Sequence, residues 1–110
     1  MNYRVAAKGT WAVYKQAQVI PADFSVTQTG DLINWTFVPN ASKAVIMILN
    51  PAQIDSANNA VIRQLVLPAT LMTTNVVNAN VTRGQTDIVV VELFDSSNTL
   101  VGFKTINAMF

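Results

Sequence analysis

The sequence contains neither cysteine nor histidine. Without cysteine the chain has no disulfide, no thiolate metal ligand and no cysteine nucleophile. Without histidine it lacks the commonest general base and the commonest metal ligand. Only four glycines are present, and they form no glycine-rich phosphate loop. We therefore expect no enzymatic activity, no cofactor and no metal site.

Charged residues are also scarce: they make up 12% of the chain, against about 25% in an average soluble protein. The net charge of +1 does not provide the basic surface that nucleic-acid binding requires. Asp87 and Glu92 have opposite parity on one expected strand, so they should face opposite ways and cannot act as a catalytic pair. Hydrophobic residues reach 51% of the chain. This excess suggests that part of the apolar surface is covered by other protein subunits, most simply in a homo-oligomer.

Long hydrophobic runs are missing as well. The longest, residues 44–49, is far too short to span a bilayer, so no membrane association is expected. The N-terminus does not show a basic segment followed by an apolar one, so no signal peptide is expected. At 110 residues with no internal repeat, the chain should form one soluble domain, residues 1–110.

The clearest structural unit is residues 87–106, DIVVVELFDSSNTLVGFKTI. Residues 88–94 are mostly β-branched, aromatic or leucine, a composition that is typical of a strand. Residues 95–98 supply turn chemistry, because Asp and Asn side chains hydrogen-bond the nearby backbone and tolerate positive φ. A second apolar run, residues 100–106, follows directly. The pattern predicts a hairpin whose first strand lies centrally in a sheet.

Further strands are expected where apolar and polar residues alternate, or where a short apolar run lies between turn residues. The N-terminal residues 1–15 also suggest a strand, although its inward face cannot be assigned. Pro51 suits the start of one helical turn. The other expected strands are residues 24–27, 32–38, 44–49, 61–67 and 71–81.

Seven or eight short strands without a long helix predict an all-β fold, specifically an antiparallel β-sandwich; a small closed barrel is the alternative. Alternation in residues 32–38, together with the apolar runs 44–49 and 88–94, predicts the members of a single interior. These are Ile33, Trp35, Phe37, Val45, Met47, Val89, Val91 and Leu93.

The two ends of the chain are the candidate protein-contact sites. Residues 1–22 contain three cations and no acid, which is typical of either a charged edge strand or a basic arm that docks on an acidic neighbour. The C-terminus ends on two large apolar residues, whereas free ends are usually polar and frayed. We therefore expect the contact residues to be Arg4, Lys8, Trp11, Met109 and Phe110.

The expected strands around Trp35, followed by the late FDSSNTLVGF hairpin, resemble an immunoglobulin-like or fibronectin-III-like sandwich, without the Cys–Trp–Cys frame of antibody domains. With its Asn, Thr and Val richness, the chain is also similar to small accessory proteins of tailed-phage virions: decoration proteins, head fibres and tail adaptors. This resemblance implies a structural interaction module located in a virion, with capsid or tail subunits as partners. The alternative is a carbohydrate- or receptor-binding sandwich module, with a glycan as ligand.

Overall fold

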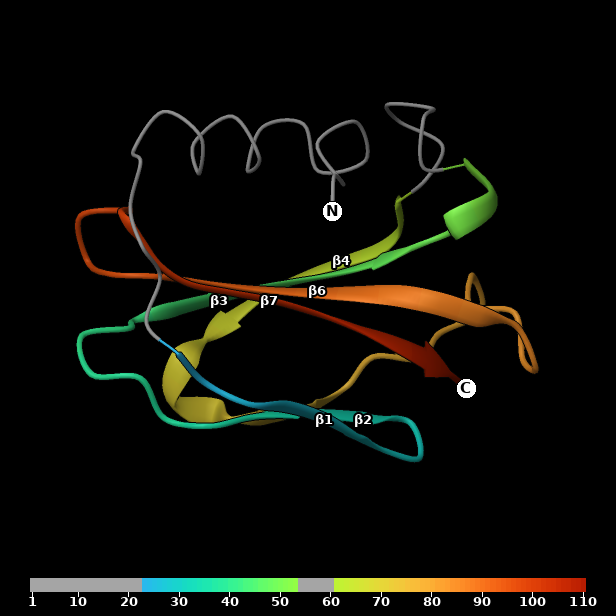
Figure 1. Ribbon diagram of the computed structural model, residues 1–110, viewed down its shortest axis with the longest axis horizontal. Helices are drawn as coiled ribbons and strands as arrows, with labels where there is room; N and C mark the ends of the chain where they lie inside the picture. Colours follow the sequence, from blue (N-terminus) through green and yellow to red (C-terminus); the bar gives the residue numbers. More distant parts are fainter. Residues whose placement is uncertain (1–22, 54–60) are drawn as a thin grey trace.

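A computed structural model describes residues 23–53 and 61–110. Within these ranges the protein is all-β, with two antiparallel sheets and two short 3-10 turns, η1 (Pro51–Gln53) and η2 (Ala69–Leu71) (Figure 1). The prediction of an all-β antiparallel fold is therefore confirmed. The strand expected in residues 1–15 and the arm assigned to residues 1–22 lie outside the described residues.

The larger sheet contains four strands in the order β4-β3-β6-β7: β4 (Val61–Pro68), β3 (Lys43–Leu49), β6 (Thr86–Phe94) and β7 (Leu100–Met109). β6 is hydrogen-bonded to β3 on one side and to β7 on the other. The expected hairpin is thus present. Its turn forms as its residue types predict, because the Asp95 carboxylate accepts hydrogen bonds from the Ser97 and Thr99 amides at 2.9 Å and Asn98 adopts a φ of 62°.

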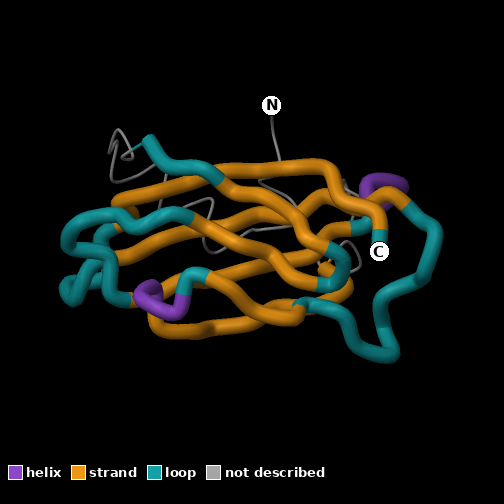
Figure 2. The backbone as a smooth tube through the Cα atoms, turned by 90° about the horizontal axis from the view of Figure 1, so that it is seen from below, coloured by secondary structure: helices purple, strands orange, loops and turns teal. Residues whose placement is uncertain are grey.

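The smaller sheet contains three strands in the order β1-β2-β5: β1 (Val26–Thr29), β2 (Leu32–Trp35) and β5 (Thr73–Asn75). The β1–β2 turn uses Gly30 at a φ of 59°, a conformation that costs glycine little. The two sheets form two layers (Figure 1), and the view from below shows the loops gathered at the two ends of the strands (Figure 2). Three connections, from β2 to β3, from β4 to β5 and from β5 to β6, cross between the sheets.

The interior lies between the two sheets. Trp35 is buried there and donates its indole N–H to the Ala69 carbonyl at 2.8 Å, which satisfies its one polar atom. The residues lining this interior alternate along β2, β3 and β6, as a pleated strand requires. They include Phe24, Val26, Ile33, Ala44, Ile46, Ile48, Val76, Val89, Val91 and Leu93.

Three of the eight residues expected in this interior are placed elsewhere. Phe37 has an exposed fraction of 65%, because β2 ends at Trp35 and the chain then turns towards Pro39. Val45 and Met47 are buried, but on the opposite face of the larger sheet. The register explains this: Ile46 is opposite Val91, so its neighbours Val45 and Met47 must point the other way. The remaining five are confirmed as interior residues.

The strand expected over residues 71–81 is also largely wrong. Only Thr73–Asn75 is extended, and the η2 turn precedes it. Met72, which joins the two, adopts a φ of 62°, a backbone conformation that alternation of side chains cannot anticipate.

Candidate protein-contact surfaces

The buried acids of the larger sheet lie on its two opposite faces, as the sequence predicts. Asp87 points into the interior, where its Oδ1 accepts a hydrogen bond from Gln85 Nε2 at 2.8 Å and its Oδ2 has no hydrogen-bond partner in the structure. Burial raises the pKa of Asp87, and the bond from Gln85 offsets part of that rise. Glu92 points to the outside of the same sheet. The two carboxylates therefore cannot act together on a substrate.

The described residues contain no group of three or more acids, histidines or cysteines able to hold a metal ion. The same ranges contain no helix with the length and hydropathy needed to cross a bilayer.

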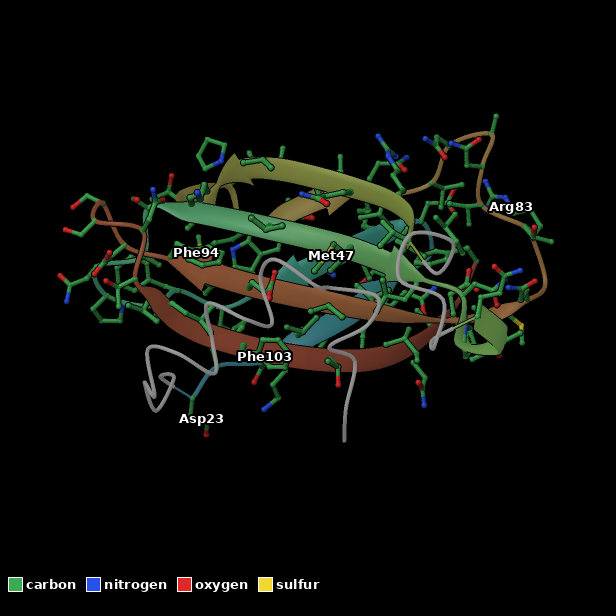
Figure 3. The ribbon with its side chains drawn as sticks, turned by 90° about the horizontal axis from the view of Figure 1, so that it is seen from above. Asp23, Met47, Arg83, Phe94 and Phe103 are labelled. Carbon is green, nitrogen blue, oxygen red and sulfur yellow. The ribbon has the colours of Figure 1, made fainter. Side chains whose placement is uncertain are left out.

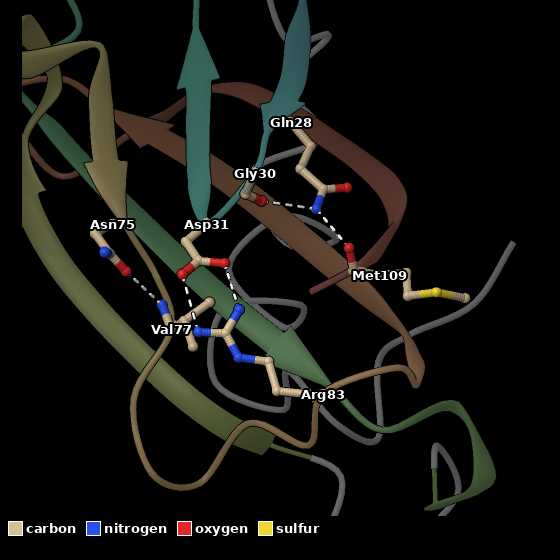
Figure 4. A network of polar contacts seen from close by, with 7 residues as sticks. All are labelled: Gln28, Gly30, Asp31, Asn75, Val77, Arg83 and Met109. Carbon is tan, nitrogen blue, oxygen red and sulfur yellow. Dashed lines mark hydrogen bonds and ion pairs between the residues drawn. The ribbon is translucent and has the colours of Figure 1, made fainter.

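The C-terminal residues meet the turn of the smaller sheet. Gln28 Nε2 donates to the Met109 carbonyl at 2.7 Å and to the Gly30 carbonyl at 2.9 Å (Figure 4). Beside them, the Arg83 guanidinium binds Asp31 through two hydrogen bonds, which lowers the pKa of that carboxyl. Arg83 is exposed and Asp31 is partly exposed to solvent, so the contribution of this ion pair to stability is small.

The two expected C-terminal contact residues lie in different surroundings. The Met109 side chain is 56% exposed, and in Figure 4 it points away from the polar network. Phe110 is half-buried and packs against the interior cluster of its own domain, while its carbonyl accepts a hydrogen bond from the Gly84 amide at 2.9 Å. Met109 is therefore accessible to a partner, and Phe110 contributes to its own core. Arg4, Lys8 and Trp11, the other expected contact residues, lie outside the described residues.

An apolar end patch, formed by Phe37, Leu71 and Met72, was not anticipated from the sequence. Antiparallel pairing of Asn34 with Thr73 places the end of β2 and the start of β5 at the same end of the smaller sheet. Phe37 follows β2 and the Leu71–Met72 pair precedes β5, so all three exposed side chains lie at this end. The only sequence signal is that these three apolar residues lie within four positions of Pro39 or Pro68, and prolines commonly end strands.

Trp35 holds this end in place. Its backbone amide donates to the Met72 carbonyl at 2.9 Å, and its indole N–H donates to Ala69 in the same turn. These bonds fix the η2 turn although Met72 has a positive φ, which is unfavourable for a residue with a side chain. The exposed side chains of Leu71 and Met72 therefore lie on a backbone that these hydrogen bonds restrain. Preorganisation of this kind lowers the entropic cost of binding a partner.

The outer face of the larger sheet is the second unexpected surface. On it the two central strands contribute Val45, Met47 and Leu49 from β3 and Ile88, Val90, Glu92 and Phe94 from β6, with Leu100 and Phe103 from β7. Figure 3 shows Met47, Phe94 and Phe103 across three adjacent strands. The seven apolar residues fully buried here contribute about 1.5–3 kcal/mol each in transfer free energy. An antiparallel sheet usually exposes its outer face to water, whereas this one is buried.

The outer face of the smaller sheet is different again. It is exposed, carries no charge, and consists mainly of hydroxyl and amide side chains. Asn34 lies at its centre, where it donates to Thr29 Oγ1 at 3.1 Å and accepts from Thr73 Oγ1 at 2.7 Å. The register places on this face Thr27, Thr29, Leu32, Asn34, Thr36, Thr73 and Asn75.

Comparison of the chain with protein-family models, with curated proteins and with solved structures finds no match to any of the three.

Proposed function

We propose that the chain is a structural interaction module of a large protein assembly, in which it binds other subunits and catalyses no reaction. A small accessory protein of a virion, such as a decoration protein, fibre or connector of a tailed phage, is the kind of component that we propose. The observation that carries the proposal is the apolar end patch: large hydrophobic side chains are exposed on a turn that Trp35 holds rigid. Exposed apolar groups on a restrained backbone are typical of protein-contact sites.

We further propose that the fold is an immunoglobulin-like sandwich of the fibronectin-III type. The order β1-β2-β5 in one sheet and β4-β3-β6-β7 in the other supports this assignment. It corresponds to the order A-B-E and C′-C-F-G of such domains when the strands are lettered along the chain. Domains of this architecture recur as binding modules, although fold alone does not define a partner.

The test is the mass of the chain in solution at rising concentration, measured by sedimentation equilibrium. We expect the wild type to self-associate beyond 12.0 kDa, and Phe37→Ser and Leu71→Ser to weaken that association because they remove apolar contact area. Val66→Ser is the matched control: it removes an exposed apolar side chain of similar accessibility, 58%, from β4 in the other sheet. A wild-type chain that remains monomeric, or a control variant that dissociates equally, contradicts the end patch as the contact.

A carbohydrate- or receptor-binding module is the second candidate. The uncharged hydroxyl and amide face of the smaller sheet favours it, because such groups suit hydrogen bonding to sugar hydroxyls. Trp35 cannot provide a stacking platform, since it is buried in the interior. Binding of a neutral oligosaccharide that Asn34→Ala and Thr73→Ala abolish, with the fold intact, would favour this candidate over the first.

A further inference from the structure

The outer face of the smaller sheet is open to solvent. In Figure 1 this sheet is the lowest layer, and no strand or 3-10 turn of the described chain lies below it. Its side chains are exposed, apart from the half-buried Asn34 at the centre. None of them carries a charge, so the face offers no counter-charge to a strongly charged partner.

The strand register arranges these side chains in two rows across the sheet, and each row takes one residue from each strand. Neighbours within a row are about 4.8 Å apart, and the two rows are about 6.7 Å apart along the strands. Every member except Leu32 is Thr or Asn, so hydroxyl and amide groups recur at nearly regular intervals. A regular surface of this kind suits a ligand that itself repeats. The first row is Thr27, Asn34 and Thr73, and the second is Thr29, Leu32 and Asn75.

Hydrogen bonds within this face determine which polar atoms remain for a ligand. The Thr73 hydroxyl donates to Asn34 Oδ1 at 2.7 Å, and Asn34 Nδ2 donates to Thr29 Oγ1 at 3.1 Å. Thr29 therefore keeps its hydroxyl hydrogen for an outside acceptor, whereas Thr73 keeps oxygen lone pairs for an outside donor. The Thr36 hydroxyl likewise accepts from the Ser25 amide at 3.0 Å and keeps its hydrogen. The face thus offers donors and acceptors side by side.

A ligand that satisfies this face must both accept and donate hydrogen bonds. Hydroxyl groups do both, whereas a carboxylate or phosphate dianion offers acceptors alone and an ammonium group offers donors alone. A protein partner is less suitable, because the centre of a protein interface is rich in apolar and aromatic side chains, and Leu32 is the one apolar residue in the two rows. The chemistry therefore favours a neutral ligand rich in hydroxyl groups, which is a carbohydrate.

The shape of the face indicates which part of a carbohydrate it suits. Sites that take up a small ligand or the end of a sugar chain are concave and surround most of it. This face is instead a pleated surface of short side chains, and the bonds of Asn34 connect all three strands across it. An extended chain can lie across the rows, with the threonine methyl groups and Leu32 against the C–H groups of the sugar rings. The interior of a chain fits such a surface better than its end.

We propose that the outer face of the smaller sheet binds the interior of an unbranched, uncharged polysaccharide chain, with Asn34, Thr29 and Thr73 as the central hydrogen-bonding residues. The inference rests on the carbohydrate-binding candidate function and specifies its ligand: a chain interior, as opposed to a chain end or an acidic sugar. Its residues differ from those of the apolar end patch, so substitutions on the face leave that patch unchanged.

The test is the migration of the full chain through native gels that contain amylose, hydroxyethyl cellulose or linear mannan. We expect at least one of these neutral polymers to retard the wild type, and the carboxymethylated form of that polymer to retard it less. If none of the three retards the wild type, or if the carboxymethylated form binds equally well, the proposal is wrong.

Matched variants locate the binding on this face. Thr29→Val and Thr73→Val keep the side-chain shape but remove a hydroxyl, so each should weaken binding by about threefold to tenfold, the value of one hydrogen bond. Thr86→Val is the control, because it removes an exposed hydroxyl from β6 of the larger sheet, and it should bind like the wild type. Urea midpoints establish that each variant is folded. Equal losses in Thr86→Val, or no loss in the other two variants, contradict the assignment.

Short sugars separate this inference from the broader carbohydrate-binding function. Maltose, cellobiose and mannobiose are titrated against the chain, and binding is measured from the amide chemical shifts of Asn34 and Thr73. We expect each disaccharide to bind more weakly than its polymer, because it reaches fewer groups of the face. A disaccharide that binds as tightly as the polymer means that a chain end is recognised, which overturns the inference and leaves the carbohydrate-binding function standing. If neither polymer nor disaccharide binds, both are wrong, and assembly through the end patch is still decided separately by sedimentation.

Discussion

Replacing Gly102 with alanine should destabilise the protein through one close contact. Gly102 lies on β7 opposite Leu93, and a Cβ built on it would be 2.9 Å from Phe24 Cε1 and 3.2 Å from Leu93 Cδ1. Real Cβ contacts of 2.9 Å essentially do not occur, so the Phe24 ring must move. Overpacking of this kind costs about 1–3 kcal/mol. The lower entropy of an unfolded chain with alanine returns about 0.4–1 kcal/mol, so we expect a net loss of about 1–2 kcal/mol.

Urea unfolding of Gly102→Ala, Phe24→Leu and the double variant separates this contact from other effects. Leucine is smaller than phenylalanine, so Gly102→Ala should cost less than about 0.5 kcal/mol in the Phe24→Leu background. Gly84→Ala provides the control. Gly84 has a φ of 82°, and the position that a Cβ would occupy is open, so alanine there is strained by its backbone alone and should be additive with Phe24→Leu. If Gly102→Ala is additive with Phe24→Leu as well, the ring does not occupy the space above Gly102, and the reasoning fails.

Two further predictions concern the interior. Trp35→Phe should lower the free energy of unfolding by about 1–3 kcal/mol, since it leaves the buried Ala69 carbonyl without its donor, and a lower urea midpoint would show this. Asp87→Asn should change how stability depends on pH: burial raises the pKa of Asp87 in the folded state, so the stability from its protonated form is complete below the unfolded pKa of 3.8 and is lost as the pH rises through the folded value. Urea midpoints from pH 3 to 7 should therefore fall with rising pH more steeply in the wild type than in Asp87→Asn. Equal slopes would show that Asp87 titrates normally.

The strands that sequence reasoning placed well are those whose composition determines their position. The hairpin formed by β6 and β7 has a long β-branched run, a turn with Asp and Asn at the required positions, and a second run close in sequence. β3 is found within one residue of its expected start for the same reason. Local chemistry and the final pairing agree in both cases, which makes such segments predictable.

The assignment of faces could not be predicted in the same way. Val45 and Met47 belong to a run that is apolar on both sides, so alternation does not tell which side faces the second sheet; only the pairing of Ile46 with Val91 decides it. For the same reason the sequence did not indicate that Glu92 would be buried on the outside of the sheet, where a charged residue would ordinarily face water.

The apolar end patch was missed because it depends on where strands stop. Phe37 has the parity of Ile33 and Trp35, but the strand ends before it. Leu71 belonged to an expected strand, yet it lies in a 3-10 turn that the buried Trp35 anchors from 34 residues away in sequence. A hydrogen bond between residues so far apart in the chain has no signature in the local sequence of the turn. Of the expected contact residues, Met109 is exposed and Phe110 packs on its own core, a difference that depends on tertiary packing alone.

The central position of β6 has a consequence for amide hydrogen exchange. Its backbone is bonded to a strand on either side, and Asp87–Phe94 are buried on both faces. Small local fluctuations cannot release those amides, so their exchange with solvent deuterium should require unfolding of the whole domain. The three-residue β5 at the edge of the smaller sheet should instead exchange through brief local openings. The slowest amides of β6 thus provide a direct measure of global stability in the native buffer, without denaturant.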